Sequence, residues 1–167
     1  KVIAGPEKKS RAQIEEDRKI TAYHEAGHAV VSHALPTQDP VHQITIVPRG
    51  QAAGMTINRP QEDRSHVTRQ RLVETLSTLL GGRAAEETAL GFVCTGAVSD
   101  LQRCTEIARD MVTKYGMSEK LGNVTFTTGH NEVFIGRDMG HMKNYSEKIA
   151  AEIDEEIQRI IRQCHDQ

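Results

Sequence analysis

The chain has 167 residues, of which 37% are hydrophobic and 26% are charged, and its formal net charge is −2. This length and composition suit a single helix-rich domain. Because no basic stripe or polybasic run is present, the charge pattern gives no reason to expect nucleic acid or anionic lipid as a partner. The apolar runs are too short to span a membrane, and the three cysteines fit neither a zinc ribbon nor a disulfide framework.

The chain opens with a short apolar stretch, the breaker Gly5-Pro6 and a charged run. Such a breaker is typical of a linker. We therefore expect residues 1–9 to be the end of a linker from a missing upstream domain, and residues 10–167 to form the folded domain.

The first predicted helix covers residues 10–35, with a break near Ile20 left open, and it stops before Pro36. Its apolar residues recur at helical spacing and predict one buried stripe: Ile20, Tyr23, Ala26, Gly27, Val30, Val31 and Ala34. From Val41 the pattern changes to β-branched residues on either side of a turn at residues 48–50. This change predicts a small two-stranded ribbon near residues 44–57.

Ser65 is expected to cap a second helix over residues 65–80, with these buried residues: Val67, Leu72, Val73, Leu76, Leu79 and Leu80. Gly81-Gly82 either ends that helix or lets it pack closely and continue towards Gly91. We expect a loop at 95–99, a helix at 100–115, an irregular stretch at 121–142 with one short strand at 124–126, and an amphipathic helix at 146–165. The predicted fold class is mainly α, an array of about six helices with one small β ribbon.

Within the first helix, His24-Glu25-Ala26-Gly27-His28 matches the pattern H-E-x-x-H. Residues i and i+4 project from the same face of a helix, so both imidazoles can bind one metal ion. Catalytic zinc needs a third protein ligand and an open position for water, and Glu25 is the candidate general base of a peptide hydrolase. Gly27 is about 1 kcal/mol less favourable than alanine inside a helix, and close approach of another backbone would explain it.

Several residues are candidates for the third ligand. Glu86 and Glu87 follow the double glycine, Asp100 begins a predicted helix, where a carboxylate is favoured in any case, and Cys94 would supply a thiolate. Three further histidines have no geometric support: His33, His42 and His66. Spacing alone leaves Glu86 and Asp100 as near-equal candidates.

Segments from almost the whole chain carry a resemblance to a known family. They are residues 2–10, 23–29, 39–42, 45–50, 81–87, 95–101 and 145–149. In this order they resemble the protease domain of the FtsH family. The members of this family are membrane-anchored, ATP-dependent zinc metalloproteases. The resemblance implies that His24, His28 and Asp100 bind one zinc ion per chain, with Glu25 as the general base. It places Glu86 nearby as a supporting carboxylate, since ligating histidines usually donate their other ring N–H to such a group.

The resemblance also implies what lies outside this sequence. The chain has no phosphate-binding loop ending in Gly-Lys-Ser or Gly-Lys-Thr, so ATP would act only through a missing upstream ATPase domain. The implied protein is a homo-hexamer that degrades unfolded or misassembled polypeptides. Its missing N-terminal segments would anchor it at the cytoplasmic face of a bacterial inner membrane, or in an organellar membrane. Val98, Cys94 and Cys104 depart from the family's usual residues, but none of them is at an implied metal-binding position.

Two rival interpretations stay open. An inactive zinc-stabilised oligomerisation module would use His24 and His28 for structure only, and it would have no need of Glu25 as a base. A deformylase-like site would take Cys94 as its third ligand.

Overall fold

The computed structural model describes residues 14–48, 53–60, 65–126 and 145–167. In chain order its helices and strands are α1 (Glu15–Ala34), β1 (Val41–Thr45), β2 (Met55–Asn58), α2 (Arg69–Ala85), α3 (Val98–Thr113) and α4 (Glu147–His165). A π-helical turn, η1 (Glu86–Leu90), extends α2, and a 3-10 turn, η2 (Thr95–Ala97), leads into α3. The expected linker at residues 1–9 and the ribbon's turn at residues 49–50 lie outside the described residues.

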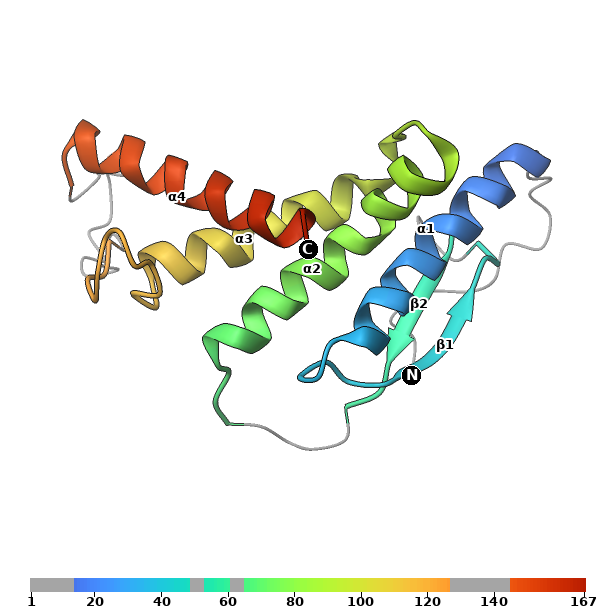
Figure 1. Cartoon of the computed structure of the whole chain (residues 1–167), viewed down its shortest axis with the longest axis horizontal. Coiled ribbons are helices and arrows are strands. Elements are labelled where there is room, and N and C mark those ends of the chain that lie inside the picture. The colour runs from blue at the N-terminus through green and yellow to red at the C-terminus, as the bar shows by residue number, and fades with distance from the viewer. Residues whose placement is uncertain (1–13, 49–52, 61–64, 127–144) are drawn as a thin grey trace, which may run out of the picture.

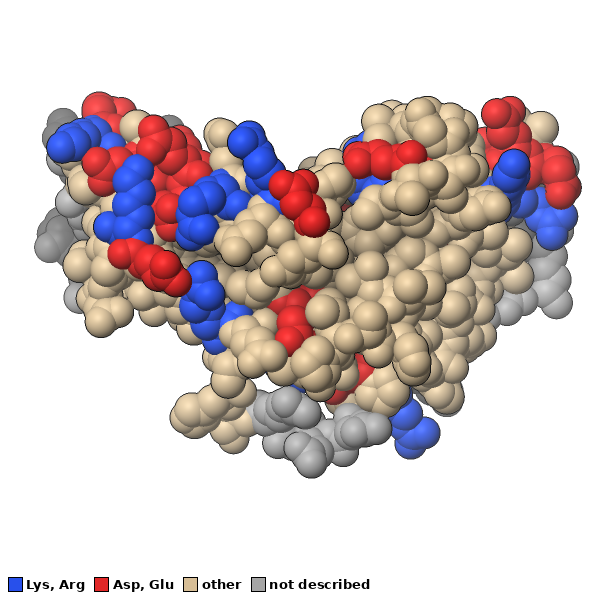
Figure 2. Space-filling model, in the orientation of Figure 1, with Lys and Arg blue, Asp and Glu red and all other residues tan. Residues whose placement is uncertain are grey.

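Helix α2 lies in the middle of the molecule (Figure 1). Helix α1 packs along one side of α2, and the antiparallel pair β1–β2 packs on α1. On the other side of α2, helices α3 and α4 contact both α2 and each other. The face in Figure 2 shows charges of both signs gathered over α4, and a broad, mostly uncharged area over α1 and the ribbon.

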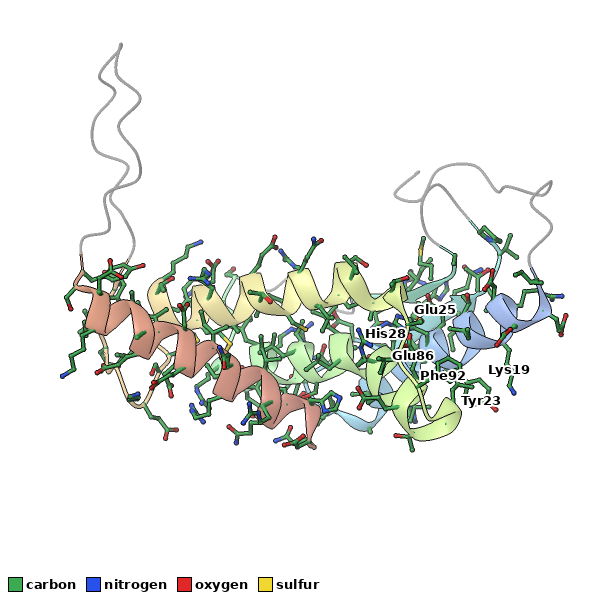
Figure 3. All side chains as sticks on the ribbon, turned by 90° about the horizontal axis from the view of Figure 1, so that it is seen from above. Lys19, Tyr23, Glu25, His28, Glu86 and Phe92 are labelled. Atoms are coloured by element: carbon green, nitrogen blue, oxygen red, sulfur yellow. The ribbon has the colours of Figure 1, made fainter. Side chains whose placement is uncertain are left out.

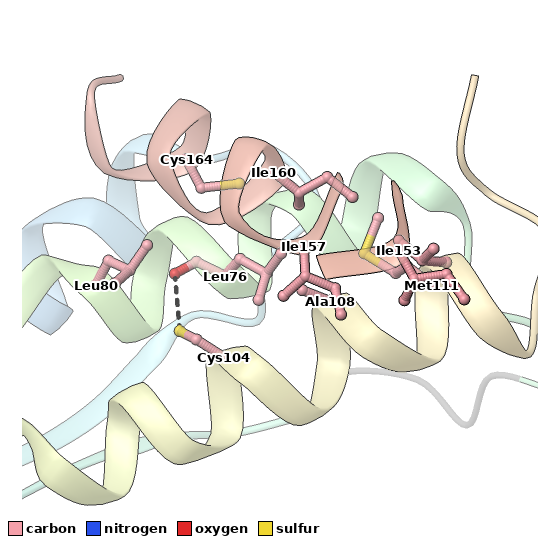
Figure 4. Packing of buried hydrophobic residues seen from close by; sticks show 10 residues of the cluster. Leu76, Leu80, Cys104, Ala108, Met111, Ile153, Ile157, Ile160 and Cys164 are labelled. Atoms are coloured by element: carbon pink, nitrogen blue, oxygen red, sulfur yellow. Dashed lines mark hydrogen bonds between the residues drawn. The ribbon is translucent and has the colours of Figure 1, made fainter. Parts of the chain in front are cut away.

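The hydrophobic core lies where α2, α3 and α4 meet (Figure 4). Its buried members are Leu76, Leu80, Cys104, Ala108, Met111, Val112, Ile153, Ile157, Ile160 and Cys164. The residues from α4 follow the predicted helical stripe, which confirms the amphipathic last helix. Ser146 caps this helix, because its hydroxyl accepts a hydrogen bond from the Ile149 N–H at 3.3 Å.

The prediction of a mainly α fold with one two-stranded ribbon is confirmed, but the described residues form four α-helices rather than about six. Three features account for the difference. Helix α1 is continuous through Ile20, Gly81-Gly82 lies inside α2, and η1 and η2 extend neighbouring helices instead of forming separate ones. The ribbon is slightly longer than expected and pairs Val41 with Asn58 and Thr45 with Met55.

Several predicted boundaries are wrong. Helix α2 begins after Thr68, whose hydroxyl accepts from the Arg71 N–H, so Ser65 is not its cap and Val67 is 51% exposed. The expected loop at 95–99 is already helical, because η2 runs directly into α3. No strand forms at 124–126, where the Phe126 N–H donates to the carbonyl of Thr113 at the end of α3. None of the described helices combines the length and the apolar character needed to cross a membrane.

Candidate metal centre

Three side chains from two helices bring one potential ligand atom each to the same point. His24 and His28 lie one turn apart on α1, and Asp100 lies in the first turn of α3. His24 Nε2 is 3.0 Å from His28 Nε2 and 3.2 Å from Asp100 Oδ2, and His28 Nε2 is 3.5 Å from Asp100 Oδ2. Residues separated by more than seventy positions in the chain therefore form one compact cluster.

The separations within this cluster fit zinc. Two ligands at about 2.0–2.1 Å from a tetrahedral zinc ion lie about 3.3 Å from each other. The three measured separations, 3.0, 3.2 and 3.5 Å, lie around that value. Two imidazole nitrogens and one carboxylate oxygen also form a common catalytic donor set, which leaves a fourth position for water.

The second nitrogen of each histidine ring has its own acceptor. His24 Nδ1 donates to Glu86 Oε1 at 2.8 Å, and His28 Nδ1 donates to the carbonyl oxygen of Thr78, also at 2.8 Å. Because neither acceptor carries a proton at neutral pH, each imidazole has its hydrogen on Nδ1 in its neutral form. The Nε2 lone pairs of both rings are then directed to the point they share with Asp100.

Glu86 is fully buried and stands on the other side of the His24 ring from Asp100. Besides His24, the backbone N–H of Cys94 donates to Glu86 Oε2 at 2.9 Å, and the Cys94 thiol donates to Oε1 at 3.1 Å. Burial opposes the charge, but these hydrogen bonds outweigh it and lower the pKa of Glu86. The carboxylate is therefore ionised at neutral pH and can hold the orientation of His24.

Glycines allow α1 and α2 to approach closely at the cluster. A Cβ on Gly27 would overlap the carbonyl oxygen of Gly81, and a Cβ on Gly82 would lie 2.6 Å from the ring of His24. The close backbone approach predicted at Gly27 is thus confirmed. Of the two interpretations of Gly81-Gly82, close packing with continuation of the helix is the one observed.

Electrostatics within the cluster keep Asp100 ionised. Burial would raise the pKa of Asp100, but hydrogen bonds with His24 and His28 outweigh burial and lower the pKa to about 2. Burial also acts to lower the pKa of both histidines, yet hydrogen bonds with Asp100, Glu86 and the Thr78 carbonyl raise it overall. The carboxylate is thus in the charged form that metal ligation requires.

Glu25 lies beside the histidines in a cleft of about 580 Å³ between α1, α2 and β2. It is 8% exposed, and its carboxylate accepts a hydrogen bond from the Thr56 hydroxyl at 2.8 Å. Figure 3 shows Glu25, His28 and Glu86 gathered in one region, while Lys19 and Tyr23 project from the other side of α1. A carboxylate, a cluster that could hold a metal ion and an open cleft are the features that metal-assisted hydrolysis requires.

A model of peptidase family M41 matches residues 11–167. The chain belongs to peptidase family M41. The resemblance to the FtsH family is confirmed by close relatives as well. This M41 chain is 54% identical over 165 residues to a protein named ATP-dependent zinc metalloprotease FtsH 1 from Thermoanaerobacter sp. (strain X514), covering 99% of the chain and 27% of that protein.

Two further relatives show the same pattern. FtsH 2 of Alkaliphilus metalliredigens (strain QYMF), also named an ATP-dependent zinc metalloprotease, is 56% identical over 165 residues, which are 99% of this chain and 24% of that protein. FtsH of Pseudothermotoga lettingae, with the same description, is 50% identical over 167 residues, 99% of this chain and 27% of that protein. The M41 chain thus spans about a quarter of the length of the curated relatives it matches.

The other candidate ligands lie elsewhere in the M41 chain. Glu87 is exposed, and its Oε2 lies 3.2 Å from His165 Nε2. The thiol of Cys94 donates a hydrogen bond to Glu86. Three histidines are exposed: His33, His42 and His66. Within the described residues the cluster that could hold a metal ion comprises His24, His28 and Asp100.

Two contacts of the site were not anticipated from the sequence. Thr56 contacts Glu25 from a strand that comes thirty-one residues later in the chain, and Thr78 supplies only its carbonyl oxygen to His28. A threonine in a short strand and a backbone carbonyl carry no local sequence signal, so only the tertiary structure reveals them.

Proposed function

We propose that residues 10–167 form the zinc endopeptidase domain of an ATP-dependent, membrane-anchored protease that degrades unfolded or misassembled proteins. The observation that carries this proposal is the cluster of His24 Nε2, His28 Nε2 and Asp100 Oδ2, with separations of 3.0–3.5 Å, beside the buried carboxylate of Glu25. The names of the relatives support zinc as the metal and proteolysis as the activity.

In this proposal His24, His28 and Asp100 hold one zinc ion, and Glu86 supports His24. When bound, zinc would supply Lewis-acid polarisation of the attacking water and of the scissile carbonyl. Glu25 takes the proton from the water as it adds to the carbonyl carbon. Glu25 then passes that proton to the leaving nitrogen, which completes the cleavage of the peptide bond.

The substrate is proposed to lie extended along β2. Met55 and Thr56 of this strand line the cleft. Among the residues that the structure describes, β1 is the strand that pairs with β2, and the other edge of β2 has no strand beside it. Strand addition reads the backbone of a substrate and leaves its sequence preference weak, which suits an enzyme for unfolded chains. Since proline cannot donate to a ladder, Met55→Pro should greatly slow the cleavage of a flexible peptide. Unchanged cleavage by this variant would exclude the pairing.

We further propose that ATP acts through a domain upstream of this sequence, to which residues 1–9 are the linker. The relatives named ATP-dependent are about four times as long as this chain, and this sequence has no phosphate-binding loop. The whole protein is then a homo-hexamer anchored by N-terminal segments at the cytoplasmic face of a bacterial membrane, or in an organellar membrane. Exposed apolar residues provide surface for such assembly: Val30 on α1, Ile44 on β1 and Val47 just after β1. A monomeric full-length protein in solution would contradict the hexamer.

The decisive experiment compares the parent chain with Glu25→Gln. We expect the variant to keep its zinc, measured by atomic emission, because Glu25 is not among the three ligands. Its cleavage of a flexible fluorogenic peptide should fall by at least about a hundredfold, the usual contribution of a general base. An active variant would overturn the mechanism. Loss of zinc from the variant would instead indicate that the carboxylate has a structural role, as in a zinc-stabilised assembly module.

A further inference from the structure

The carboxylate of Glu25 is held by a side chain from the neighbouring strand. Thr56 Oγ1 lies 2.8 Å from Glu25 Oε2 and 3.0 Å from the backbone carbonyl oxygen of Glu25. The hydroxyl has one proton, and the shorter of the two distances is the one to the carboxylate oxygen. Within the part of the chain that the structure describes, no other side chain donates to this carboxylate.

The backbone that carries Thr56 is fixed by contacts on both sides of it. Successive residues of an extended chain point to opposite faces, so Gly54, Thr56 and Asn58 share the face directed at α1. Gly54 is buried, and a Cβ there would lie 2.8 Å from Cγ and 2.9 Å from Oε1 of Glu25. Asn58 Nδ2 donates to Ser32 Oγ on α1 at 2.7 Å.

The sheet also fixes the register of this strand. Thr56 is paired with Ile44 of β1, and Asn58 is paired with Val41. Because a slip of one residue would turn Thr56 to the opposite face, the pairing and the Asn58–Ser32 contact together determine where the hydroxyl lies. The position of the hydroxyl is therefore set by the ribbon as a whole.

We propose that Thr56 is a positioning residue for the general base, and that β2 orients Glu25 through it. This inference rests on the proposed function, since it requires Glu25 to act as a base. A glutamate has three rotatable side-chain bonds, and a base must stay within hydrogen-bond reach of the proton it takes. Because rotation about the Cγ–Cδ bond of Glu25 would move Oε2 away from Thr56, the hydrogen bond restrains that rotation and with it the position of Oε1. Because Gly54 has no side chain, the carboxylate of Glu25 has room to lie against the backbone there.

The test replaces the hydroxyl in the zinc-loaded chain and follows kcat and KM separately on a flexible peptide. Thr56→Val should keep the zinc content and KM and should lower kcat about tenfold, as expected for loss of one hydrogen bond to a charged group. Thr56→Ser retains the donor and should recover most of kcat. If Thr56→Val does not fold, Thr56→Ala removes the same hydroxyl and should show the same loss of kcat.

The matched control is Thr113→Val, which removes a hydroxyl that donates to the Arg109 carbonyl at 2.8 Å near the end of α3. Its kcat should equal that of the parent. The inference is overturned if the valine or alanine variant keeps kcat within about twofold of the parent, or if the serine variant is as slow as the valine variant. An inactive Glu25→Gln beside a fully active Thr56→Val would contradict only the positioning role. An active Glu25→Gln would contradict the proposed function itself.

Discussion

At the scale of single residues, several hydrogen bonds hold Glu86 in place, and Glu86 in turn orients the ring of His24. Its side chain is 0% exposed, and an unpaired carboxylate at such a position would be strongly destabilising. Three donors compensate for the burial: His24 Nδ1 and the Cys94 thiol at Oε1, and the Cys94 N–H at Oε2. With both oxygens accepting, the carboxylate cannot turn, and neither can the imidazole that it holds.

Glu86→Gln should therefore weaken metal binding. An amide has one oxygen and one NH₂ group, so one of the two positions would set a donor against the N–H of Cys94 or of His24. Changes to such supporting groups usually reduce metal affinity about 10–100-fold. Competition with a chelator at fixed zinc would measure the loss.

The neighbouring Glu87 provides the control for this variant. It is exposed and contacts His165 rather than the cluster, so Glu87→Gln should bind zinc as the parent does. Equal affinities of the two glutamine variants would show that Glu86 does not support the site.

At the scale of elements, α4 is tied to the segment after α3 by a second buried carboxylate. Glu156 is 3% exposed and accepts from the Ser118 hydroxyl at 2.7 Å and from Arg159 Nε at 2.8 Å. The hydrogen bond from Arg159 lowers the pKa of Glu156 below its ordinary value. Burial acts in the opposite direction, and the hydrogen bond from Ser118 adds to the lowering. Protonation of this group is therefore linked to the stability of the α3–α4 pair.

The sign of this linkage leads to a prediction. A carboxylate whose pKa is lower in the folded chain stabilises the fold above its unfolded pKa, and the stabilisation disappears as the pH falls through the folded pKa. Glu156→Gln should thus have a lower free energy of unfolding than the parent at pH 7. The difference in free energy between the two proteins should become smaller below about pH 4. Urea unfolding of both proteins at several pH values would measure it. Glu155 is exposed, so Glu155→Gln should differ much less from the parent in free energy of unfolding at pH 7. A difference for Glu156→Gln that does not change with pH would contradict the linkage.

Helix α4 and helix α1 show what could and could not be predicted from the sequence. In α4 four of the five buried residues are apolar, and Glu156 is the exception, so periodicity located the helix and its buried face. In α1 the predicted apolar stripe is partly wrong, because Tyr23 and Val30 are 41% and 68% exposed. The buried residues there include His24, Glu25 and Ser32, since the face turned to α2 and β2 carries the polar groups of the cleft.

Some features of the candidate site could likewise be predicted from the sequence, and others could not. The motif predicted which side chains of α1 would cluster, and the close approach at Gly27 followed from the cost of glycine in a helix. Spacing alone could not separate Glu86 from Asp100, because both contact the same imidazole from opposite sides. Their different positions depend on how α2 and α3 pack, which no local pattern encodes.

At the scale of the whole molecule, the site joins two parts of the fold. Helix α1 supplies His24, His28 and Glu25, and the ribbon beside it supplies Thr56. The bundle of α2, α3 and α4 supplies Asp100 from α3 and contains the hydrophobic core (Figure 4). Helix α2 belongs to the bundle and also packs on α1, with Thr78 and Gly82 at the histidines and Leu76 in the core. The orientation of α1 relative to α3 therefore sets the distances from Asp100 to the two histidines.

Asp100 lies in the first turn of α3, and the same helix continues without a loop into the core at Cys104. One residue inserted between these two positions would turn Asp100 by about 100° about the helix axis and move it about 1.5 Å. The carboxylate would then leave the histidines even though every side chain of the site was unchanged. If the cluster binds zinc as proposed, the four-residue spacing from Asp100 to Cys104 is thus as strict a requirement for the site as the identity of the three side chains.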